Sequence, residues 1–337
     1  MFKKEWSKEN HNYNKTIKLS FLSELTKDSY TEDFHNTFIV FNSINDILYL
    51  VYSNIKNHII CVNLENNEKI CEIKNNSLVS NFNHHLDEKN KRDLLMLVSS
   101  EKKEFKIWDM KNIECIFKLN IKGLSCKGSF LNYDNNLYLV ANTSNFDNNS
   151  GEINIYDFHS NKIKKINDFN EPCHKIFVFY DKKKSKNYII STHFKYIKSY
   201  DYEENKLYLK YEDGGISHFS SEIYEDNEDI VKIIDSCWSG DIKIWNFHTG
   251  ELLNKIEIKY GSIRDICLLD KDHLVLGCDT FDIKLIDINS KTIIQSLKVG
   301  DDWISTIKKF DHPKYGKCLI LQGMEKNQIK MFIIENC

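Results

Sequence analysis

The sequence predicts an all-β fold built from seven copies of one four-stranded antiparallel unit. Three observations support this prediction. A short apolar phrase recurs at nearly constant spacing along the 337 residues. A polar turn suited to a tight hairpin follows most copies, and the segments between copies lack the helical periodicity of apolar residues. Each period of such a repeat must therefore contain one whole structural unit made of strands.

The recurring phrase is an alternating strand that ends in an apolar residue, usually an aromatic one, followed by Asp or Asn. Its copies are Ile59–Asn63, Phe105–Asp109, Ile153–Asp157, Ile197–Asp201, Ile242–Asn246, Ile283–Asp287 and Ile329–Ile333. The penultimate residues, which serve as markers, are Val62, Trp108, Tyr156, Tyr200, Trp245, Ile286 and Phe332. The intervals between consecutive markers are 46, 48, 44, 45, 41 and 46 residues. So regular a period indicates a repeat architecture.

The turn after each marker supports the same alignment. Five positions after a marker come Asn67, Asn161, Asn205 and Gly250. These residue types tolerate the left-handed backbone conformation that a tight hairpin demands. Ile113 and Lys291 occupy the same position in two other copies and depart from this preference.

Each period also contains two strand-like runs before the marker, for example 262–269 and 273–278. Four strands in every 41 to 48 residues make one antiparallel blade. Seven blades repeated around an axis make a closed ring with short, protected edges. We therefore predict a seven-bladed β-propeller of four-stranded antiparallel blades.

The last blade lacks length for an outer strand, because the seventh copy lies close to residue 337. The run 15–22 alternates like a strand and has no partner of its own. We therefore predict that this N-terminal strand completes the last blade and hides both edges of the ring. Residues 15–337 then form a single propeller domain, preceded by a polar tail over residues 1–14.

Charge and apolar patterning exclude several classes of protein. The formal net charge is -3, and Arg92 and Arg264 are the only arginines. Because arginine supplies the bidentate fork that reads guanine, sequence-specific binding of nucleic acid is not expected. The longest apolar runs, such as 47–52 and 94–98, are far shorter than the roughly 18 residues of a membrane span. We expect no transmembrane segment.

The ten cysteines indicate a reducing compartment. No two of them have the two-residue spacing of a zinc knuckle or a redox motif. Most lie in apolar runs, where a reduced cysteine behaves as a small core residue. The first ten residues are charged and lack the apolar stretch of a secretory signal. We therefore expect a cytoplasmic or nuclear protein with no cofactor and no metal.

The histidines do not form a metal-binding motif in the sequence. His84 and His85 belong to the polar segment 83–93, which we interpret as a long connection between two strands rather than a ligand pair. His159 and His248 occupy equal repeat positions in outer hairpin turns, which favours a role in the turn.

The repeat resembles the WD-repeat β-propeller family over almost all of residues 15–337. The Trp-Asp pair is complete at Trp108–Asp109, and Trp245–Asn246 is next closest. The Gly-His dipeptide that begins family repeats is missing, and 238–241 stand where a tight-turn Asp is usual. The resemblance implies a non-catalytic scaffold or adaptor that binds other proteins or peptides as part of a complex. No catalytic motif is found, so we expect no enzymatic activity.

Candidate binding residues lie where the outer strand of one blade leads into the inner strand of the next. They are His174, His218, Arg264 and Trp303. Trp303 follows two aspartates, so it could clamp a basic or methylated peptide through a cation–π contact. Packing of Trp303 between blades is the alternative.

A second candidate is a basic loop formed by Lys182, Lys183, Lys184 and Lys186. It and the acidic run 225–229 fall between the first and second strands of their blades, hence on one face. Solvated loop tips are one interpretation, and a docking surface for phosphorylated peptides or anionic lipid is another. Lipid binding is not favoured, because propellers that bind phosphoinositides carry paired arginines, which this chain lacks.

A third alternative is a substrate-recruiting subunit of a ubiquitin ligase. Propellers with that function often carry Trp-Asp-x-Arg, and the corresponding phrase here is 108–111, which ends in Lys111. Lysine lacks the fork geometry of arginine, so the match is incomplete.

Overall fold

The computed structural model describes residues 17–26, 28–30, 36–122, 125–157, 163–166, 169–214, 217–225, 230–258, 261–323 and 328–336. These residues form seven four-stranded antiparallel sheets. Within this part of the chain, no helix is long and apolar enough to cross a membrane.

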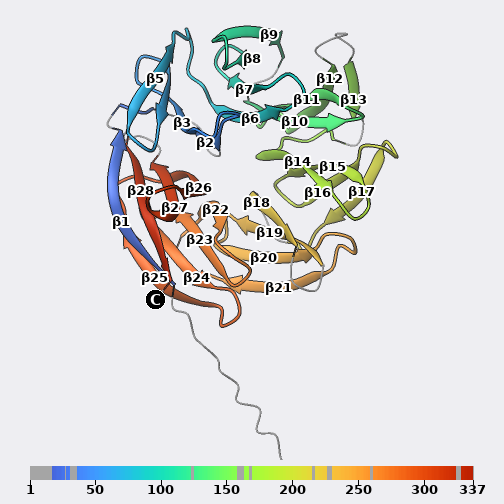
Figure 1. The fold of residues 1–337 in the computed structure, drawn as a ribbon. Helices are drawn as coiled ribbons and strands as arrows, with labels where there is room; N and C mark the ends of the chain where they lie inside the picture. Colours follow the sequence, from blue (N-terminus) through green and yellow to red (C-terminus); the bar gives the residue numbers. More distant parts are fainter. Residues whose placement is uncertain are drawn as a thin grey trace, which may run out of the picture.

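Each sheet is one blade (Figure 1). From the innermost to the outermost strand, blade 1 has β2 Phe38–Asn42, β3 Leu48–Ser53, β4 Ile59–Asn63 and β5 Glu68–Ile73; blade 2 has β6 Asn81–Asp87, β7 Arg92–Ser99, β8 Glu104–Asp109 and β9 Glu114–Asn120; blade 3 has β10 Ser125–Tyr133, β11 Asn136–Asn145, β12 Ser150–Asp157 and β13 Ile163–Ile166; and blade 4 has β14 Lys175–Asp181, β15 Lys186–Thr192, β16 Ile197–Asp201 and β17 Lys206–Tyr211. Blade 5 has β18 His218–Glu225, β19 Val231–Cys237, β20 Asp241–Asn246 and β21 Leu252–Glu257; blade 6 has β22 Ile263–Leu268, β23 His273–Cys278, β24 Asp282–Asp287 and β25 Thr292–Lys298; and blade 7 has β26 Ile304–His312, β27 Gly316–Gly323, β28 Ile329–Asn336 and β1 Ile17–Thr26.

The blades form a closed ring. Each innermost strand contacts the innermost strands of both neighbouring blades, and β26 of blade 7 contacts β2 of blade 1. Figure 1 shows these innermost strands around the centre of the disc. All seven marker residues of the repeat lie on the third strands, β4, β8, β12, β16, β20, β24 and β28. The predicted seven-bladed propeller is confirmed.

The ring closes through the N-terminal strand, as predicted. Strand β1 pairs antiparallel with β28, from Ile17 opposite Asn336 to Thr26 opposite Ile329. It runs four residues beyond the predicted end at Leu22. Residues 15 and 16 and the predicted tail 1–14 lie outside the described residues. Because β1 pairs with β28, the third strand of the last blade has no unpaired edge.

The apolar cores lie between the blades. Seven clusters of buried apolar side chains each join two adjacent blades, including blades 7 and 1. The second strand of a blade is therefore covered on both faces, and Leu94 to Val98 on β7 are all buried. The outer strand β25 instead alternates between exposed and half-buried side chains. This arrangement explains why second strands are continuous apolar runs and outer strands are not.

The hairpin turn imposes its backbone geometry whatever residue occupies it. Asn67, Asn205 and Gly250 have positive φ angles of 59°, 55° and 76°, as their residue types suggested, while Asn161 lies outside the described residues. Ile113 and Lys291 adopt the same conformation, with φ angles of 55° and 59°. Packing of the blades thus overrides the local preference of a β-branched residue.

The interpretation of 83–93 as a long connection was wrong. His84 and His85 lie on strand β6, and only residues 88–91 connect β6 to β7. The ring of His84 stacks on Phe41 with centroids 3.7 Å apart, and its Nε2 lies 2.8 Å from Asp93 Oδ1. A polar innermost strand lacks the apolar alternation by which the other strands were found. His248 lies in a hairpin turn, as expected, and His159 lies outside the described residues.

Candidate interaction surface

The two faces of the disc carry different connections. Because neighbouring strands are antiparallel, the links between second and third strands lie on the same side as the links from one blade to the next. We name this side the handover face. The links between first and second and between third and fourth strands lie on the other side, named the hairpin face.

The handover face carries a continuous series of aromatic side chains, which we name the aromatic arc. Four of its rings are exposed by 38 to 46%, and the remaining members lie beneath and between them. The arc consists of Phe146, His174, Phe194, Phe219, Trp238, Arg264 and Trp303. Three predicted residues, His174, Arg264 and Trp303, are thereby brought together.

The rings of the arc are in contact from blade 3 to blade 5. The ring of His174 is stacked between Phe146 and Phe219, with centroid distances of 5.2 and 4.7 Å. Phe194 meets the edge of the His174 ring at 4.9 Å, and Phe219 lies 5.4 Å from Trp238. Rings at these separations attract one another beyond simple burial, so the arc forms one packed unit.

Arg264 continues the arc into blade 7. Its guanidinium carbon lies 4.1 Å from the ring centre of Trp238 and 4.6 Å from that of Trp303. The arginine is only 3% exposed, whereas the two indoles are 46 and 38% exposed. Burial lowers the pKa of Arg264, and the carboxylate of Asp279, 4.0 Å from Nη2, partly offsets this effect. The cation therefore holds two half-exposed indoles in place from between them.

Local backbone features aim these side chains. The innermost strands of blades 5, 6 and 7 each carry an irregularity at the second residue, which is Phe219, Arg264 and Ser305 in turn. Such a bulge re-aims the extra residue. Gly240, with φ of 83°, follows Trp238 closely, and a Cβ there would lie 2.5 Å from the carbonyl oxygen of Ile258. A larger residue at this turn would displace the loop that carries the indole.

A buried polar network ties together the innermost strands beneath the arc. The Ser220 hydroxyl donates to Asp265 Oδ1 at 2.6 Å, and the backbone N–H of Ile307 donates to Oδ2 at 2.9 Å. The Lys175 ammonium donates to the Ser220 hydroxyl and to the carbonyl of Ser221, each at 3.0 Å. Burial lowers the pKa of Lys175, and Asp265 opposes that shift. The network links blades 4, 5, 6 and 7.

Hollows lie at both ends of the arc. One of about 360 Å³ surrounds Phe194 between blades 3 and 4, with Pro172 and Tyr196 in its wall. Another of about 200 Å³ has Asp301, Asp302 and Ile304, the sequence neighbours of Trp303, in its wall. Phe194 thus opens into one hollow, and the second hollow adjoins the chain segment that carries Trp303.

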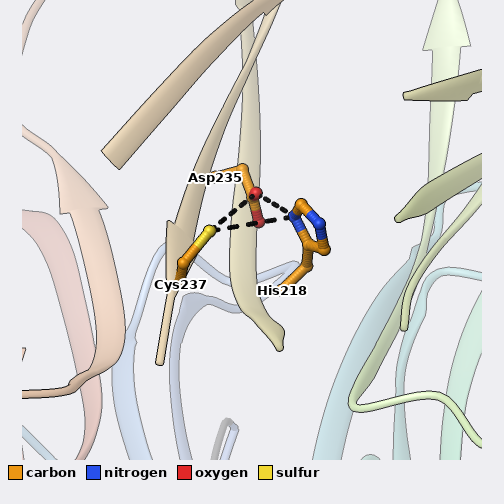
Figure 2. Close-up of side chains that lie close together, drawn as sticks. All are labelled: His218, Asp235 and Cys237. Atoms are coloured by element: carbon orange, nitrogen blue, oxygen red, sulfur yellow. Dashed lines mark hydrogen bonds and ion pairs between the residues drawn. The ribbon is translucent and has the colours of Figure 1, made fainter. Parts of the chain in front are cut away.

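His218, the fourth predicted residue, is fully buried instead of facing the arc. Figure 2 shows its Nδ1 hydrogen-bonded to the carboxylate of Asp235, with the thiol of Cys237 beside both. The sulfur lies 3.7 Å from Asp235 Oδ2 and 3.9 Å from His218 Nδ1. Burial raises the pKa of Asp235 despite the nearby histidine, and burial also raises the pKa of Cys237.

These three residues are the group that could hold a metal ion within the described part of the chain. Their ligand atoms all lie within 4.8 Å of one another, and nitrogen, oxygen and sulfur are ligand types that zinc accepts. A structural zinc needs a fourth ligand and a deprotonated thiol, however. His218 Nδ1, the Asp235 carboxylate and the Cys237 thiol form one hydrogen-bonded cluster of blade 5.

The predicted basic loop lies on the hairpin face, where three of its four lysines contact acceptors of the protein itself. Lys183 Nζ lies 2.6 Å from Glu225, the first residue of the acidic run, and Lys184 Nζ lies 3.0 Å from His248 Nδ1. Lys186 contacts Asp201 at 2.8 Å and also Glu204, and Lys182 is exposed. The rest of the acidic run, 226–229, lies outside the described residues.

Sequence reasoning missed Phe146, Phe194, Phe219 and Trp238. Phe146, Phe194 and Trp238 each lie in the link between the second and third strands of their blade, in three consecutive blades. An aromatic residue in the same turn of successive repeats was the signal that could have found them.

Comparison with known proteins adds no assignment to this geometry. No model of a known protein family matches the chain, and a search of curated proteins finds no match either.

Proposed function

We propose that the protein is a divergent WD-repeat propeller and acts as a non-catalytic interaction module, which captures a peptide segment of another protein on the aromatic arc. The observation that carries this proposal is the series of exposed rings on the handover face. Aromatic side chains there are packed against one another and yet left open to solvent. In the described part of the chain, none of these rings belongs to the buried apolar clusters between the blades.

The exposed area of the arc is large enough for specific binding. A ring buries roughly 150–250 Å² when fully covered, so four rings about 40% exposed leave roughly 300 Å² accessible. An apolar patch of about this size on a monomer is often functional. Tryptophan is also enriched among residues that dominate binding energy at interfaces. A partner that covers Trp238 and Trp303 would therefore gain most of its affinity from them.

The chemistry of the indole pair favours an apolar segment over a cationic one. The position between Trp238 and Trp303 is filled by the guanidinium of Arg264, so the protein supplies its own cation there. A second cation on the outer ring faces would be repelled by the first. Proline, aliphatic or aromatic side chains of an extended peptide stack on these faces without that penalty. We therefore infer a partner peptide that runs along the arc between the two hollows.

The test uses a displayed library of peptides selected on the purified wild-type protein. The double variant Trp238→Ala/Trp303→Ala should bind the selected peptides at least about 30-fold more weakly, because each indole contributes as a binding hot spot. Tyr180→Ala is the matched control, since Tyr180 is 51% exposed but lies on the hairpin face. Calorimetric titration measures both affinities.

Two results would contradict the proposal. One is a double variant that keeps its thermal transition and still binds the selected peptides with wild-type affinity. The other is a set of peptides whose binding is lost in Tyr180→Ala and retained in the double variant, which would place the interaction on the hairpin face.

The contacts of the basic loop do not favour an anionic partner. Lys183, Lys184 and Lys186 each have an acceptor within the protein, and a phosphate would have to displace it. We also infer a cytosolic or nuclear location, which is supported by the use of cysteine as a buried apolar residue in several blades. Cell fractionation with an antibody to the chain tests that location.

A further inference from the structure

Two cysteines of blade 1 lie directly opposite each other on neighbouring strands. Cys61 on β4 and Cys71 on β5 are register partners, and both are free thiols. Directly opposed residues of an antiparallel pair have Cα atoms about 4.5–5.5 Å apart and side chains on the same face. That separation falls within the range of about 4.4–6.8 Å that a disulfide requires. In the registers of the described strands, no other two cysteines are opposed.

The two thiols already interact. Each thiol shifts the pKa of the other, and both pack into the apolar cluster between blades 1 and 2. The ladder is also interrupted beside the pair, between Cys61 and Val62, so that Ile70 is the extra residue of a bulge. A bulge loosens the local pairing and lets β5 adjust.

The pair is asymmetric in a way that gives each cysteine a role. Cys61 is 1% exposed, whereas Cys71 lies on the outer strand and is half-buried. The hydrogen bond from Cys61 lowers the pKa of the Cys71 thiol, and the same interaction raises the pKa of Cys61. Cys71 is therefore the accessible nucleophile, and Cys61 stands behind it as the resolving thiol.

The fold itself does not require cysteine at this place. The corresponding opposed pairs beside the bulges of four other blades are Ile107 with Phe117, Ser199 with Leu209, Ile244 with Asn254, and Leu285 with Gln295. These pairs have no chemistry in common. A shared structural demand therefore does not explain two thiols in blade 1.

We propose that Cys61 and Cys71 are a site of reversible oxidation, which forms a disulfide between β4 and β5 by exchange with a small-molecule disulfide such as oxidised glutathione. The Cys71 thiolate attacks one sulfur of glutathione disulfide, and one glutathione leaves as its thiolate, which takes up a proton. Cys61 then loses its proton and attacks the Cys71 sulfur, and the second glutathione leaves. Two protein thiols are oxidised to one disulfide, and one glutathione disulfide is reduced to two thiols.

The experiment incubates the purified full-length protein with oxidised glutathione, blocks free thiols, and maps cysteines by peptide mass spectrometry. Wild type should yield a Cys61–Cys71 cross-linked peptide that disappears on addition of reduced glutathione. Its melting temperature should rise by a few degrees, because the bond constrains the unfolded chain. Cys61→Ser should stop at a glutathione adduct on Cys71, since the resolving thiol is gone. Cys71→Ser should form neither product.

Cys115→Ser is the matched control, because Cys115 is an exposed thiol on the outer strand of blade 2. It should leave formation of the Cys61–Cys71 bond unchanged. The proposal is overturned if wild type forms no such bond in oxidised glutathione. It is equally overturned if Cys61→Ser accumulates no adduct on Cys71, or if Cys71 links instead to Cys115 of another molecule.

Discussion

Arg92 and Arg264, the two arginines of the chain, lie on opposite faces and in opposite surroundings. On the hairpin face, Arg92 binds two carboxylates, Asp87 at 2.9 Å and Asp109 at 3.3 Å. On the handover face, Arg264 lies between the rings of Trp238 and Trp303. The pKa of Arg92 is raised, because hydrogen bonds to its carboxylates outweigh burial, whereas burial lowers that of Arg264.

The contrast extends to the two faces as a whole. Charges on the hairpin face meet partners within the protein, as Lys183 meets Glu225 and His248 meets Asp181 at 3.1 Å. The handover face leaves aromatic surface uncovered and fixes it from below with a buried cation and a buried carboxylate. A face whose charges are already paired gains little from a charged partner. A face with rigid, uncovered rings gains binding energy from an apolar partner.

The largest expected difference between the faces concerns their carboxylates. Asp265→Ala should lower the free energy of unfolding by about 3–5 kcal/mol, because the Ser220 hydroxyl and the N–H of Ile307 lose a buried acceptor and the buried Lys175 loses a nearby negative charge. Glu225→Ala breaks an ion pair with about half-exposed partners and should cost less than about 1 kcal/mol. Urea unfolding followed by circular dichroism measures both variants. Equal losses of unfolding free energy in the two variants would show that the polar network beneath the aromatic arc does not support the arc.

Acid should destabilise the handover face through His193, which lines the hollow at Phe194. Burial lowers its pKa to about 3, while its Nδ1 donates to the carbonyl of Pro172 at 2.9 Å. The unfolded chain binds a proton near pH 6.5, so stability present above that pH is lost as pH falls towards 3. The loss should be on the order of 3–4 kcal/mol and should be absent in His193→Gln. Parallel pH profiles of variant and wild type, measured by urea unfolding, would refute this assignment.

The two arginines provide a direct test of the contrast. Arg92→Met and Arg264→Met should each lower the free energy of unfolding by about 1–2 kcal/mol at pH 7. Burial alone would raise the pKa of Asp87, but hydrogen bonds from Asn90 and Arg92 lower that pKa. The contribution of that pair is therefore present above about pH 4 and is lost as pH falls through the lowered pKa.

The loss caused by Arg92→Met should accordingly shrink at pH 3, while the loss caused by Arg264→Met should persist, since indole rings do not titrate. Unfolding in urea at both pH values distinguishes the two. An Arg264→Met loss that vanishes in acid would mean that Asp279, and not the two rings, holds the guanidinium.

The smallest effect concerns a turn on the hairpin face. Ile113 is held at a φ of 55°, which is unfavourable for a β-branched residue by about 1–2 kcal/mol. Ile113→Asn should raise the free energy of unfolding by about 1 kcal/mol, and the reciprocal change Asn67→Ile should lower it by a similar amount. Thermal unfolding measures both. A neutral pair of results would mean that side-chain contacts in these turns compensate for the backbone strain.

The blades could be predicted because their signal is local. The marker phrase, the alternation around Trp108 or Trp245 and the turn at Asn67 or Asn205 each depend on a few neighbouring residues, so each is visible in the chain. The strand that carries His84 and His85 was missed for the same reason, since its polar residues lack the alternation of a strand. The contact partners of His84, which are Phe41 and Asp93, come from other strands.

The candidate surface could be predicted only in part. Trp303, Arg264 and His174 were found because the links between blades could be placed from the repeat. Their contacts with Trp238 and Phe219 could not be predicted, because they depend on bulges in β18 and β22 that have no sequence signature. The burial of His218 beneath the surface follows from the same irregularity.

By itself, the sequence determined the number of blades, the place of each third strand and the closing of the ring by β1. These features could be predicted because the marker phrase and the apolar alternation of the strands recur at a regular interval along the sequence. Only the tertiary structure decided that a buried arginine fills the space between two indoles, and that Cys61 faces Cys71. Such contacts depend on register and on how neighbouring blades pack, and packing joins residues that the linear order keeps apart.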